Sequence, residues 1–303
     1  MQNTFSRLLF GHAATFILAT VFLLAGCASV PESVPRVEKR PVPLKVGLAL
    51  SSGAGRGFAH IGVIKALEAN GIQVDLIAGS SAGAFVGALY ASGMGGMALQ
   101  EAAMKLDEAQ FKEWSLSAKG LITGKPIQDY INGRVRGKTI ERFLKPIGVV
   151  ATDLGTGQAV VFRSGDTGVA VRASCAVPGV YAPVRISGRD YVDGAVSSPV
   201  PVRAVREMGA NFVIAVDIGH KPRWSGAVES GVGVLMQSAN VMGHVISQNE
   251  LREADFVISP EVSDVDPASF TNRYEVILRG ERATNEAMPR LLAELRKRRE
   301  SRQ

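Results

Sequence analysis

Cysteine is nearly absent from this chain, whose 303 residues contain only Cys27 and Cys175. Two cysteines build no multi-bridge disulfide framework and offer no CxxC ligand set for zinc. Cys175 stands in an apolar run with no group nearby that would lower the pKa of its thiol, so we expect a buried small side chain and not a nucleophile. We therefore expect neither a metal site nor another cofactor.

Complete nucleotide-binding motifs are missing as well, although residues 51–57 are rich in glycine. The dinucleotide fingerprint GxGxxG would need its third glycine at Phe58, and a P-loop would need a Gly-Lys-Ser or Gly-Lys-Thr run that does not follow. What remains is a turn that leads into a helix and exposes several backbone amides, which can hold a developing oxyanion. Three roles stay open for Arg56: to stabilise this loop, to contact a phosphate, or to lie at the surface.

The chain has one long, nearly unbroken apolar run, residues 13–24, which is too short to span a membrane comfortably. We interpret residues 1–26, in which Arg7 is the only Lys or Arg, as a signal peptide. The sequence Leu24-Ala25-Gly26-Cys27 resembles the lipobox of bacterial lipoproteins, which implies that Cys27 is lipidated and begins the mature chain. The alternative is an ordinary signal peptide followed by an incidental cysteine.

The residues after Cys27 indicate a location and a tether. Ala28 occupies the position where an inner-membrane retention signal would have aspartate, which favours the outer membrane facing the periplasm. Prolines recur among charged and small residues in 27–43, which is typical of a semi-extended tether. We expect a lipid-anchored protein of the bacterial cell envelope, with one folded domain at 44–303.

The net charge of +6 does not point to nucleic acid. Much of the positive excess lies in Arg296-Lys297-Arg298-Arg299, and such a cluster is favoured by the dipole at a helix end. Contact with anionic lipid headgroups is the alternative for this cluster. We expect no nucleic-acid partner, and the oligomeric state stays open.

Segments with strand and helix character alternate along the domain. We expect strands at 45–50, 74–78, 147–152, 158–163, 181–186, 190–192, 212–217 and 256–259. We expect helices at 58–70, 82–92, 169–175, 202–208, 232–252 and 274–299, with irregular helical structure over 93–145. This alternation predicts an α/β fold with a mainly parallel sheet that is covered by helices on both faces.

The pentad Gly79-Ser80-Ser81-Ala82-Gly83 stands between an apolar strand and a small-residue helix. A serine at such a sharp corner exposes its hydroxyl at the top of a sheet, and the free amides and dipole of the following helix point to the same place. This is the pattern of a nucleophile elbow in a serine hydrolase, with Ser81 as the nucleophile. Pentads of this composition also occur by chance in chains rich in Gly, Ser and Ala.

The serine needs a base, and the sequence offers several. The order Ser81, Asp193, His220 matches that of α/β-hydrolases, but neither His60, His220 nor His244 stands in a motif that fixes its position. Asp193 closes a strand and precedes a glycine, and a carboxylate bonded directly to the serine can take its proton in a dry pocket. An aspartate in an ordinary turn is the alternative interpretation.

Four blocks together resemble the patatin-like phospholipase family over residues 44–217. They are Gly53-Ala54-Gly55-Arg56-Gly57-Phe58-Ala59-His60-Ile61-Gly62-Val63, Gly79-Ser80-Ser81-Ala82-Gly83, Arg172-Ala173-Ser174-Cys175-Ala176-Val177-Pro178-Gly179 and Asp193-Gly194-Ala195. The resemblance implies a three-layer α/β/α sandwich and a Ser-Asp dyad without histidine. It also implies hydrolysis of lipid acyl esters.

Carried over by position, the resemblance implies Ser81 as nucleophile and Asp193 as base. The oxyanion hole would then be formed by the amides of Gly53, Ala54 and Gly55, near Arg56 and Gly57. Two departures stand out: the family's glycine triplet is Ser52-Gly53-Ala54 here, and the last glycine of its Asp-Gly-Gly form is Ala195.

The sequence thus predicts a membrane-anchored serine lipid acyl hydrolase, that is a phospholipase, lysophospholipase or esterase, acting on a lipid ester. One alternative is a Ser-His-Asp esterase of the α/β-hydrolase type. Another is a non-catalytic envelope lipoprotein on a hydrolase fold. A transferase that uses an alcohol in place of water would look identical in sequence.

Overall fold

The computed structural model describes residues 43–107, 122–219 and 231–301. The chain divides into two units, Met1–Pro41 and Val42–Gln303, and all described residues belong to the second unit. The predicted signal peptide, Cys27 and its tether up to residue 42 lie outside the described residues, so these domain assignments stay predictions. No helix in the described ranges has the length and apolar character that crossing a bilayer requires.

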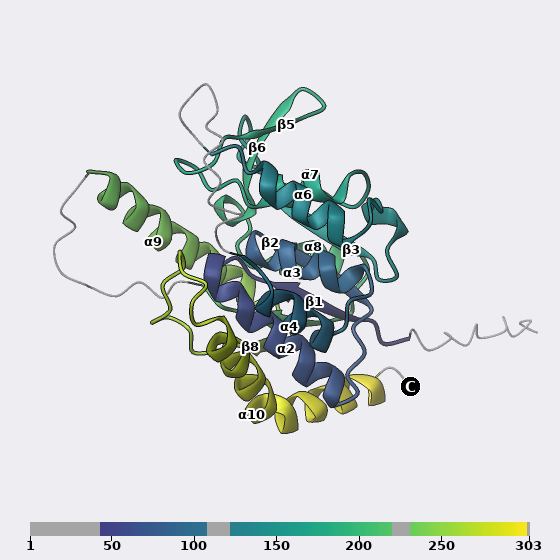
Figure 1. Ribbon diagram of the computed structural model, residues 1–303. Helices are drawn as coiled ribbons and strands as arrows, with labels where there is room; N and C mark the ends of the chain where they lie inside the picture. Colours follow the sequence, from purple (N-terminus) through teal and green to yellow (C-terminus); the bar gives the residue numbers. More distant parts are fainter. Residues whose placement is uncertain (1–42, 108–121, 220–230, 302–303) are drawn as a thin grey trace, which may run out of the picture. The chain divides into compact units, whose positions relative to one another are not determined.

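In the described part of the chain, eight strands form one mixed sheet (Figure 1). Five parallel strands lie in the order β3 (Ile147–Asp153), β2 (Leu76–Ser80), β1 (Val46–Leu50), β7 (Phe212–Val216) and β8 (Phe256–Ile258). The remaining strands are antiparallel: β6 (Arg189–Asp193) pairs with β3 and with β5 (Val184–Ile186), and β4 (Ala159–Phe162) also pairs with β3. The predicted mainly parallel sheet is confirmed.

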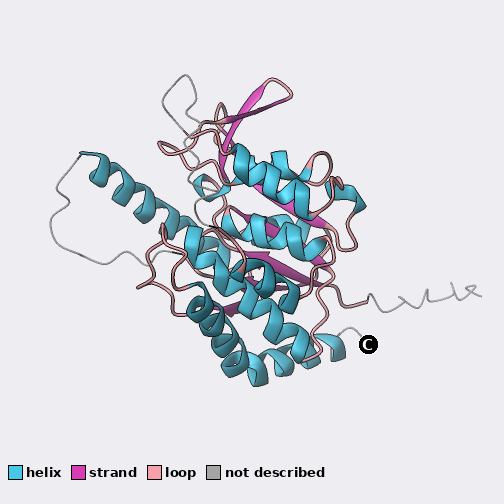
Figure 2. Cartoon of the chain, in the orientation of Figure 1, coloured by secondary structure: helices cyan, strands magenta, loops and turns pink. Residues whose placement is uncertain are grey.

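Helices pack on both faces of this sheet and complete three layers (Figure 2). One face carries α2 (Phe58–Ala69), α3 (Ala82–Ala91), α4 (Gly96–Met104), α6 (Lys125–Arg134), α7 (Thr167–Ser174) and α10 (Arg273–Glu300). The other face carries α8 (Val202–Glu207) and the last turn of α9 (Gly231–Leu251). This confirms the predicted α/β/α sandwich, with outer layers of very unequal size.

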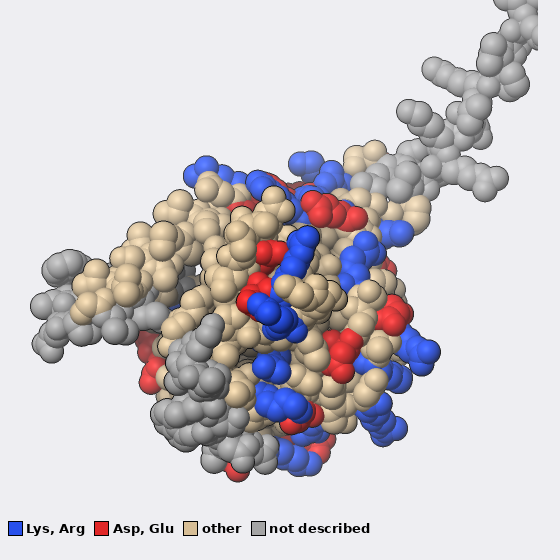
Figure 3. Space-filling view, turned by 90° about the horizontal axis from the view of Figure 1, so that it is seen from above, with Lys and Arg blue, Asp and Glu red and all other residues tan. Residues whose placement is uncertain are grey.

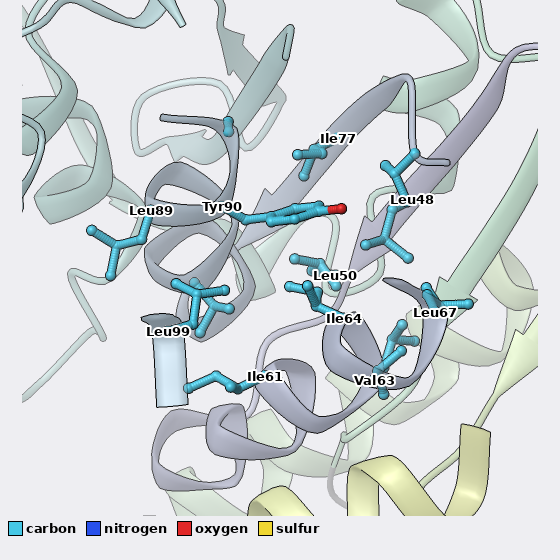
Figure 4. Packing of buried hydrophobic residues seen from close by; sticks show 14 of the residues in the cluster. Leu48, Leu50, Ile61, Val63, Ile64, Leu67, Ile77, Leu89, Tyr90 and Leu99 are labelled. Carbon is cyan, nitrogen blue, oxygen red and sulfur yellow. The ribbon is translucent and has the colours of Figure 1, made fainter. Parts of the chain in front are cut away.

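The strands serve both layers because their side chains alternate between the faces. In β1, Leu48 and Leu50 belong to the larger core, whereas Ala49 belongs to the core beneath α8. Figure 4 shows the larger core, in which Leu48 and Leu50 meet Ile64 of α2 and Tyr90 of α3. These side chains are almost fully buried, and burying each large aliphatic side chain contributes about 1.5–3 kcal/mol.

The second predicted strand is displaced by two residues from its expected range of 74–78 and runs over Leu76–Ser80. The reason is Asp75, whose carboxylate accepts a hydrogen bond from the amide of Val46 at 2.7 Å and so caps the start of β1. The strand then continues up to the predicted corner at Ser81.

The register of the sheet brings two distant segments to one level. Ser80 of β2 pairs with Val150 of β3, and the next residue of β3, Ala151, pairs with Asp193 of β6. Ser81, Ala151 and Asp193 therefore form one row across the end of the sheet.

Candidate active site

Ser81 occupies the sharp corner between β2 and α3, as the strand, turn and helix pattern predicts. Its backbone has φ 53° and ψ −118°, a conformation that costs a residue other than glycine about 1–3 kcal/mol. The turn fits because Gly83 passes close to β1, where a Cβ atom would lie only 2.1 Å from the carbonyl oxygen of Leu50. The strained turn thus holds the hydroxyl outward at the end of the sheet.

The Ser81 hydroxyl donates a hydrogen bond to Asp193. Oγ of Ser81 lies 2.7 Å from Oδ2 of Asp193, and the two residues are 7% and 3% exposed. The other carboxylate oxygen, Oδ1, accepts a hydrogen bond of 2.8 Å from the amide of Ala195. Burial raises the pKa of Asp193 to about 6, while the bonds from Ala195 and Ser81 oppose that rise. A carboxylate held next to a serine hydroxyl with this raised pKa has the basicity to accept the hydroxyl proton.

The backbone of Asp193 is fixed on both sides. Its amide donates to the carbonyl oxygen of Ala176 at 2.9 Å, and its own carbonyl oxygen accepts from Oγ1 of Thr152 at 2.8 Å. Gly194 lets the chain pass β3, because a Cβ atom there would lie 2.3 Å from the carbonyl oxygen of Val150. The carboxylate therefore approaches Ser81 from a rigid support.

Ser174 is a part of the site that sequence reasoning did not single out. It ends α7 and is fully buried. Its Oγ accepts a hydrogen bond from the amide of Ser81 at 2.8 Å and donates one to the carbonyl oxygen of Val150 at 2.5 Å. Ser174 thus holds the strained corner in place. The only signal in the sequence was its position within the block that resembles the family's segment before the aspartate.

The glycine-rich loop forms a short 3-10 helix, η1 (Ala54–Gly57), between β1 and α2. The amide of Gly55, which we expected to face the oxyanion, instead donates to the carbonyl oxygen of Pro267 at 2.8 Å. In this conformation the expectation is wrong, because the amide of Gly55 already donates to Pro267. Within the described residues no hydrogen bond involves the amides of Gly53 and Ala54, so these two amides are the donors that remain. Ala54 has φ 48°, which agrees with the loss of a favoured glycine at this position.

Arg56 is buried, so its placement at the surface is wrong. The residue is 6% exposed and lines the same cavity as Ser81. Its Nε and Nη1 atoms have no hydrogen-bond partner among the described residues. Burial lowers the pKa of the guanidinium and the charge of Asp217 opposes this. The site therefore contains a cationic group with two buried donor atoms, Nε and Nη1, that have no partner among the described residues.

Among the described residues, no histidine forms a hydrogen bond with Ser81 or Asp193. His60 is fully buried and its Nε2 lies 2.8 Å from the carbonyl oxygen of Ser51. Burial lowers the pKa of His60 to about 4, so the ring is neutral and donates to that carbonyl. His244 of α9 lines the cavity, but the hydrogen bond of the Ser81 hydroxyl goes to Asp193. His220 lies outside the described residues.

Cys175 is half-buried and lines the cavity, whereas we expected a buried small side chain. Burial and the neighbouring charge of Asp193 raise the pKa of its thiol, so the thiol stays protonated. Within the described ranges, no group of three or more His, Cys, Asp or Glu side chains is placed to hold a metal ion.

A cavity of about 1110 Å³ opens in front of the dyad. Its wall is mainly apolar and includes Phe58, Phe85, Leu89, Leu99, Ile127, Val265 and Phe270, together with Ser81 and Asp193. Such a wall suits an apolar ligand.

Comparison with known sequences identifies the family of this chain and several relatives. The sequence model of the family described as "Patatin-like phospholipase" matches residues 48–206. An NTE family protein of Mycobacterium tuberculosis, named as uncharacterized, is 38% identical over 189 residues, which cover 57% of this chain and 49% of that protein. Lysophospholipase NTE1 of Debaryomyces hansenii is 31% identical over 208 residues, which cover 64% of this chain and 13% of that protein. The chain thus matches about half the length of the mycobacterial relative.

Solved structures that align with this chain have low sequence identity to it. The crystal structure of VipD from Legionella pneumophila aligns with a TM-score of 0.45 and 15% identity, covering 81% of this chain and 67% of VipD.

Proposed function

This chain belongs to the patatin-like phospholipase family, and on that premise we propose that it is a lipid acyl hydrolase with Ser81 as nucleophile and Asp193 as general base. The observation that carries the proposal is the 2.7 Å hydrogen bond from Ser81 Oγ to Asp193 Oδ2 in the wall of an apolar cavity. Each group alone is common in proteins, but a strained serine bonded to a buried carboxylate is a catalytic arrangement.

The reaction proceeds in two halves. Asp193 accepts the proton of Ser81 while Oγ attacks the ester carbonyl, and the amides of Gly53 and Ala54 stabilise the tetrahedral oxyanion. Collapse of this intermediate releases the alcohol, which takes the proton from Asp193, and leaves an acyl group on Ser81. A water molecule then gives a proton to Asp193 as its oxygen attacks the acyl carbonyl. When this second tetrahedral intermediate collapses, Asp193 returns the proton to Ser81 Oγ and the fatty acid leaves.

The cavity supports a lipid substrate with a long acyl chain and a polar headgroup. Its apolar wall suits the acyl chain. Arg56, which lines the cavity and has two donor atoms without a partner among the described residues, suits an anionic headgroup such as a phosphate, because a guanidinium forms charge-assisted bonds with phosphate oxygens. The lysophospholipase name of the Debaryomyces relative agrees with this class of substrate.

We further propose that the protein is attached to the bacterial cell envelope through a lipid on Cys27. The support is the lipobox-like run before Cys27 and the proline-rich segment after it. Mass spectrometry of the mature N-terminus tests this, because a diacylglyceryl group on Cys27 should be present and should vanish in Cys27→Ser.

The dyad is tested with a chromogenic fatty ester and a lysophospholipid. We expect Ser81→Ala and Asp193→Asn to lose about a thousandfold or more of kcat/KM on both substrates. Ser92→Ala is the matched control, because the Ser92 hydroxyl only donates to the carbonyl oxygen of Leu89 at the end of α3. Near-full activity in either dyad variant would refute the dyad.

A fluorophosphonate probe separates the alternatives. A covalent adduct on Ser81 of the folded protein excludes a purely structural lipoprotein, whereas absence of an adduct favours it. A Ser-His-Asp esterase would instead lose its activity in His220→Ala or His244→Ala.

A further inference from the structure

Helix α9 is unusual because it lacks charge. Residues 231–249 contain no Lys, Arg, Asp or Glu, and the first charged residue of the helix is Glu250. A helix at the surface of a globular domain ordinarily carries a charged or strongly polar outer face. The outer face of α9 therefore lacks the charged side chains that are usual on a solvent-exposed helix.

The outer face carries an apolar stripe. Val234, Leu235, Val241, Met242 and Val245 are between 43% and 71% exposed, and they recur at helical spacing along one side of α9. We name these five residues the α9 stripe. Figure 1 shows α9 extending away from the sheet, and in Figure 3 the described atoms of this arm, at the left, show neither blue nor red. An exposed apolar surface of this kind, interrupted here by Ser238, marks an interaction site.

The α9 stripe continues into the cavity of the dyad. Met242 belongs to the stripe and also lines the cavity. Val180 and Val196, which come from other parts of the chain, also line the cavity and are 39% and 47% exposed. An apolar path therefore leads from the outer face of α9 to the cavity wall that holds Ser81.

The C-terminal end of α9 is fastened next to the dyad. The carboxylate of Glu250 is 6% exposed and accepts hydrogen bonds from the hydroxyl of Ser198 and, at 2.7 Å, from the amide of Val200. Both partners follow Asp193 closely in the chain. The end of α9 nearest the stripe's Val245 is thus anchored beside the strand that carries Asp193.

We propose that the α9 stripe docks on a lipid bilayer and turns the mouth of the cavity toward it. The inference rests on the proposed function, since a lipid substrate has to leave a bilayer to reach Ser81. A helix that lies in the membrane interface buries its apolar face about 5–10 Å into the boundary between headgroups and acyl chains. A second copy of the chain on the stripe would instead cover Met242 at the mouth. The net charge of +6 also favours an anionic lipid surface over a second basic chain.

A fluorescent probe at the α9 stripe tests the docking in the full chain. Leu235→Cys, made in a Cys27→Ser and Cys175→Ala background, is labelled with an environment-sensitive dye. It is then mixed with vesicles of phosphatidylethanolamine and phosphatidylglycerol. We expect the emission to shift to the blue and to be quenched by lipids with brominated acyl chains.

The matched control is Leu144→Cys in the same background. Leu144 is 79% exposed, and it precedes β3, at the end of the sheet opposite to Ser81. We expect its label to stay in water when vesicles are added. A label at position 235 that behaves like the one at 144 would overturn the proposal. So would a blue shift that depends on protein concentration and needs no vesicles, because it would indicate a second copy.

Activity gives an independent readout. Leu235→Asp combined with Val241→Asp should lower hydrolysis of vesicle-bound lysophospholipid by about tenfold or more, since two charges replace apolar contacts with the bilayer. Hydrolysis of a short water-soluble ester should not change, and Leu144→Asp should affect neither substrate. Equal losses on both substrates would contradict docking. If the unmodified chain hydrolysed neither substrate, the proposed function would fail, while the probe would still decide whether α9 enters the bilayer.

Discussion

The amide of Gly55 donates a hydrogen bond to the carbonyl oxygen of Pro267, at 2.8 Å. This bond fastens the glycine-rich loop beside Ser81 to a segment near the end of the chain. It removes one of three predicted oxyanion donors and at the same time fixes the position of the other two, Gly53 and Ala54.

A side chain at Gly55 should separate the two segments. In Gly55→Ala the Cβ atom would lie 2.8 Å from the carbonyl oxygen of Pro267 and 2.9 Å from that of Ser269. We expect a loss of about 1–3 kcal/mol in the free energy of unfolding. We also expect kcat/KM on a soluble ester to fall by about 10- to 100-fold, because the oxyanion donors are displaced.

Gly133→Ala in α6 is the control for this change, because a Cβ atom at Gly133 meets nothing within 4 Å. It should leave activity unchanged and raise stability slightly, since alanine favours a helix. Equal activity of both variants would show that the bond to Pro267 does not position the donors.

The activity should depend on pH through Asp193. The base works only when ionised, and burial raises the pKa of Asp193 to about 6. We expect kcat/KM on a soluble ester to increase about tenfold per pH unit below about pH 6 and to reach a plateau above it. Glu250, whose burial raises its pKa to about 7, is a second group that titrates in this range. In Glu250→Gln, kcat/KM should therefore still increase with pH up to about pH 6. If this increase were lost in Glu250→Gln, the result would contradict Asp193 as the base.

The burial of Asp193 should also reduce stability at neutral pH. The pKa of about 6 in the folded protein exceeds the ordinary value of 3.8, so the fold disfavours the ionised carboxylate. The stabilising contribution of Asp193 is therefore largest at acid pH, falls as the pH rises from about 4 to about 6, and stays constant above that. We expect Asp193→Asn to be inactive but more stable at pH 8, by up to about 3 kcal/mol.

Thermal unfolding at pH 8 and at pH 4 measures this effect, and the gain should be absent at pH 4. The control is Asp129→Asn, since the Asp129 side chain is 58% exposed and pairs with Lys125 at the surface. Its stability should change little at either pH. A variant Asp193→Asn that is less stable at pH 8 would show that the two hydrogen bonds of the carboxylate outweigh its burial.

The strain at Ser81 should be measurable by comparing two inactive variants. Ser81→Gly and Ser81→Ala both remove the hydroxyl, but only glycine adopts φ 53° without strain. Glycine relieves the strain in the folded state, but it also gives the unfolded chain more conformational entropy, which offsets part of the gain. We expect Ser81→Gly to be more stable than Ser81→Ala by about 1 kcal/mol. Denaturant titration provides the comparison.

The same pair of changes at Ser92 gives the opposite order. Ser92 has φ −67°, an ordinary helical value, so Ser92→Gly should be less stable than Ser92→Ala. If glycine were the less stable variant at Ser81 as well, the corner would store no strain.

The corner at Ser81 and the fold class could be predicted from the sequence because their signals are local. The alternation of strands and helices, and small residues around Ser81, need no knowledge of distant contacts. Asp193 could be proposed only because a block around it resembles a family, since an aspartate before a glycine is common in turns. Its approach to Ser81 depends on the register of β3 and β6.

Other parts of the site could not be predicted, because their partners are far away in the chain. Nothing near Gly55 indicates that its amide bonds Pro267. The burial of Arg56 depends on contacts with distant parts of the chain, whereas an arginine in a turn usually lies at the surface. Ser174 acts through a hydroxyl whose two bonds link α7 to the corner and to β3.

The row of Ser81, Ala151 and Asp193 has a consequence for how the protein becomes active. Successive residues of a strand face opposite sides of the sheet, so a slip of one residue between β3 and β6 would place the carboxylate on the wrong side. A chain with that slip would still have the serine, its corner and most of its core. A reactive Ser81 hydroxyl therefore indicates that β6 has paired with β3 in the correct register. Molecules in which this pairing has not yet formed would be inactive.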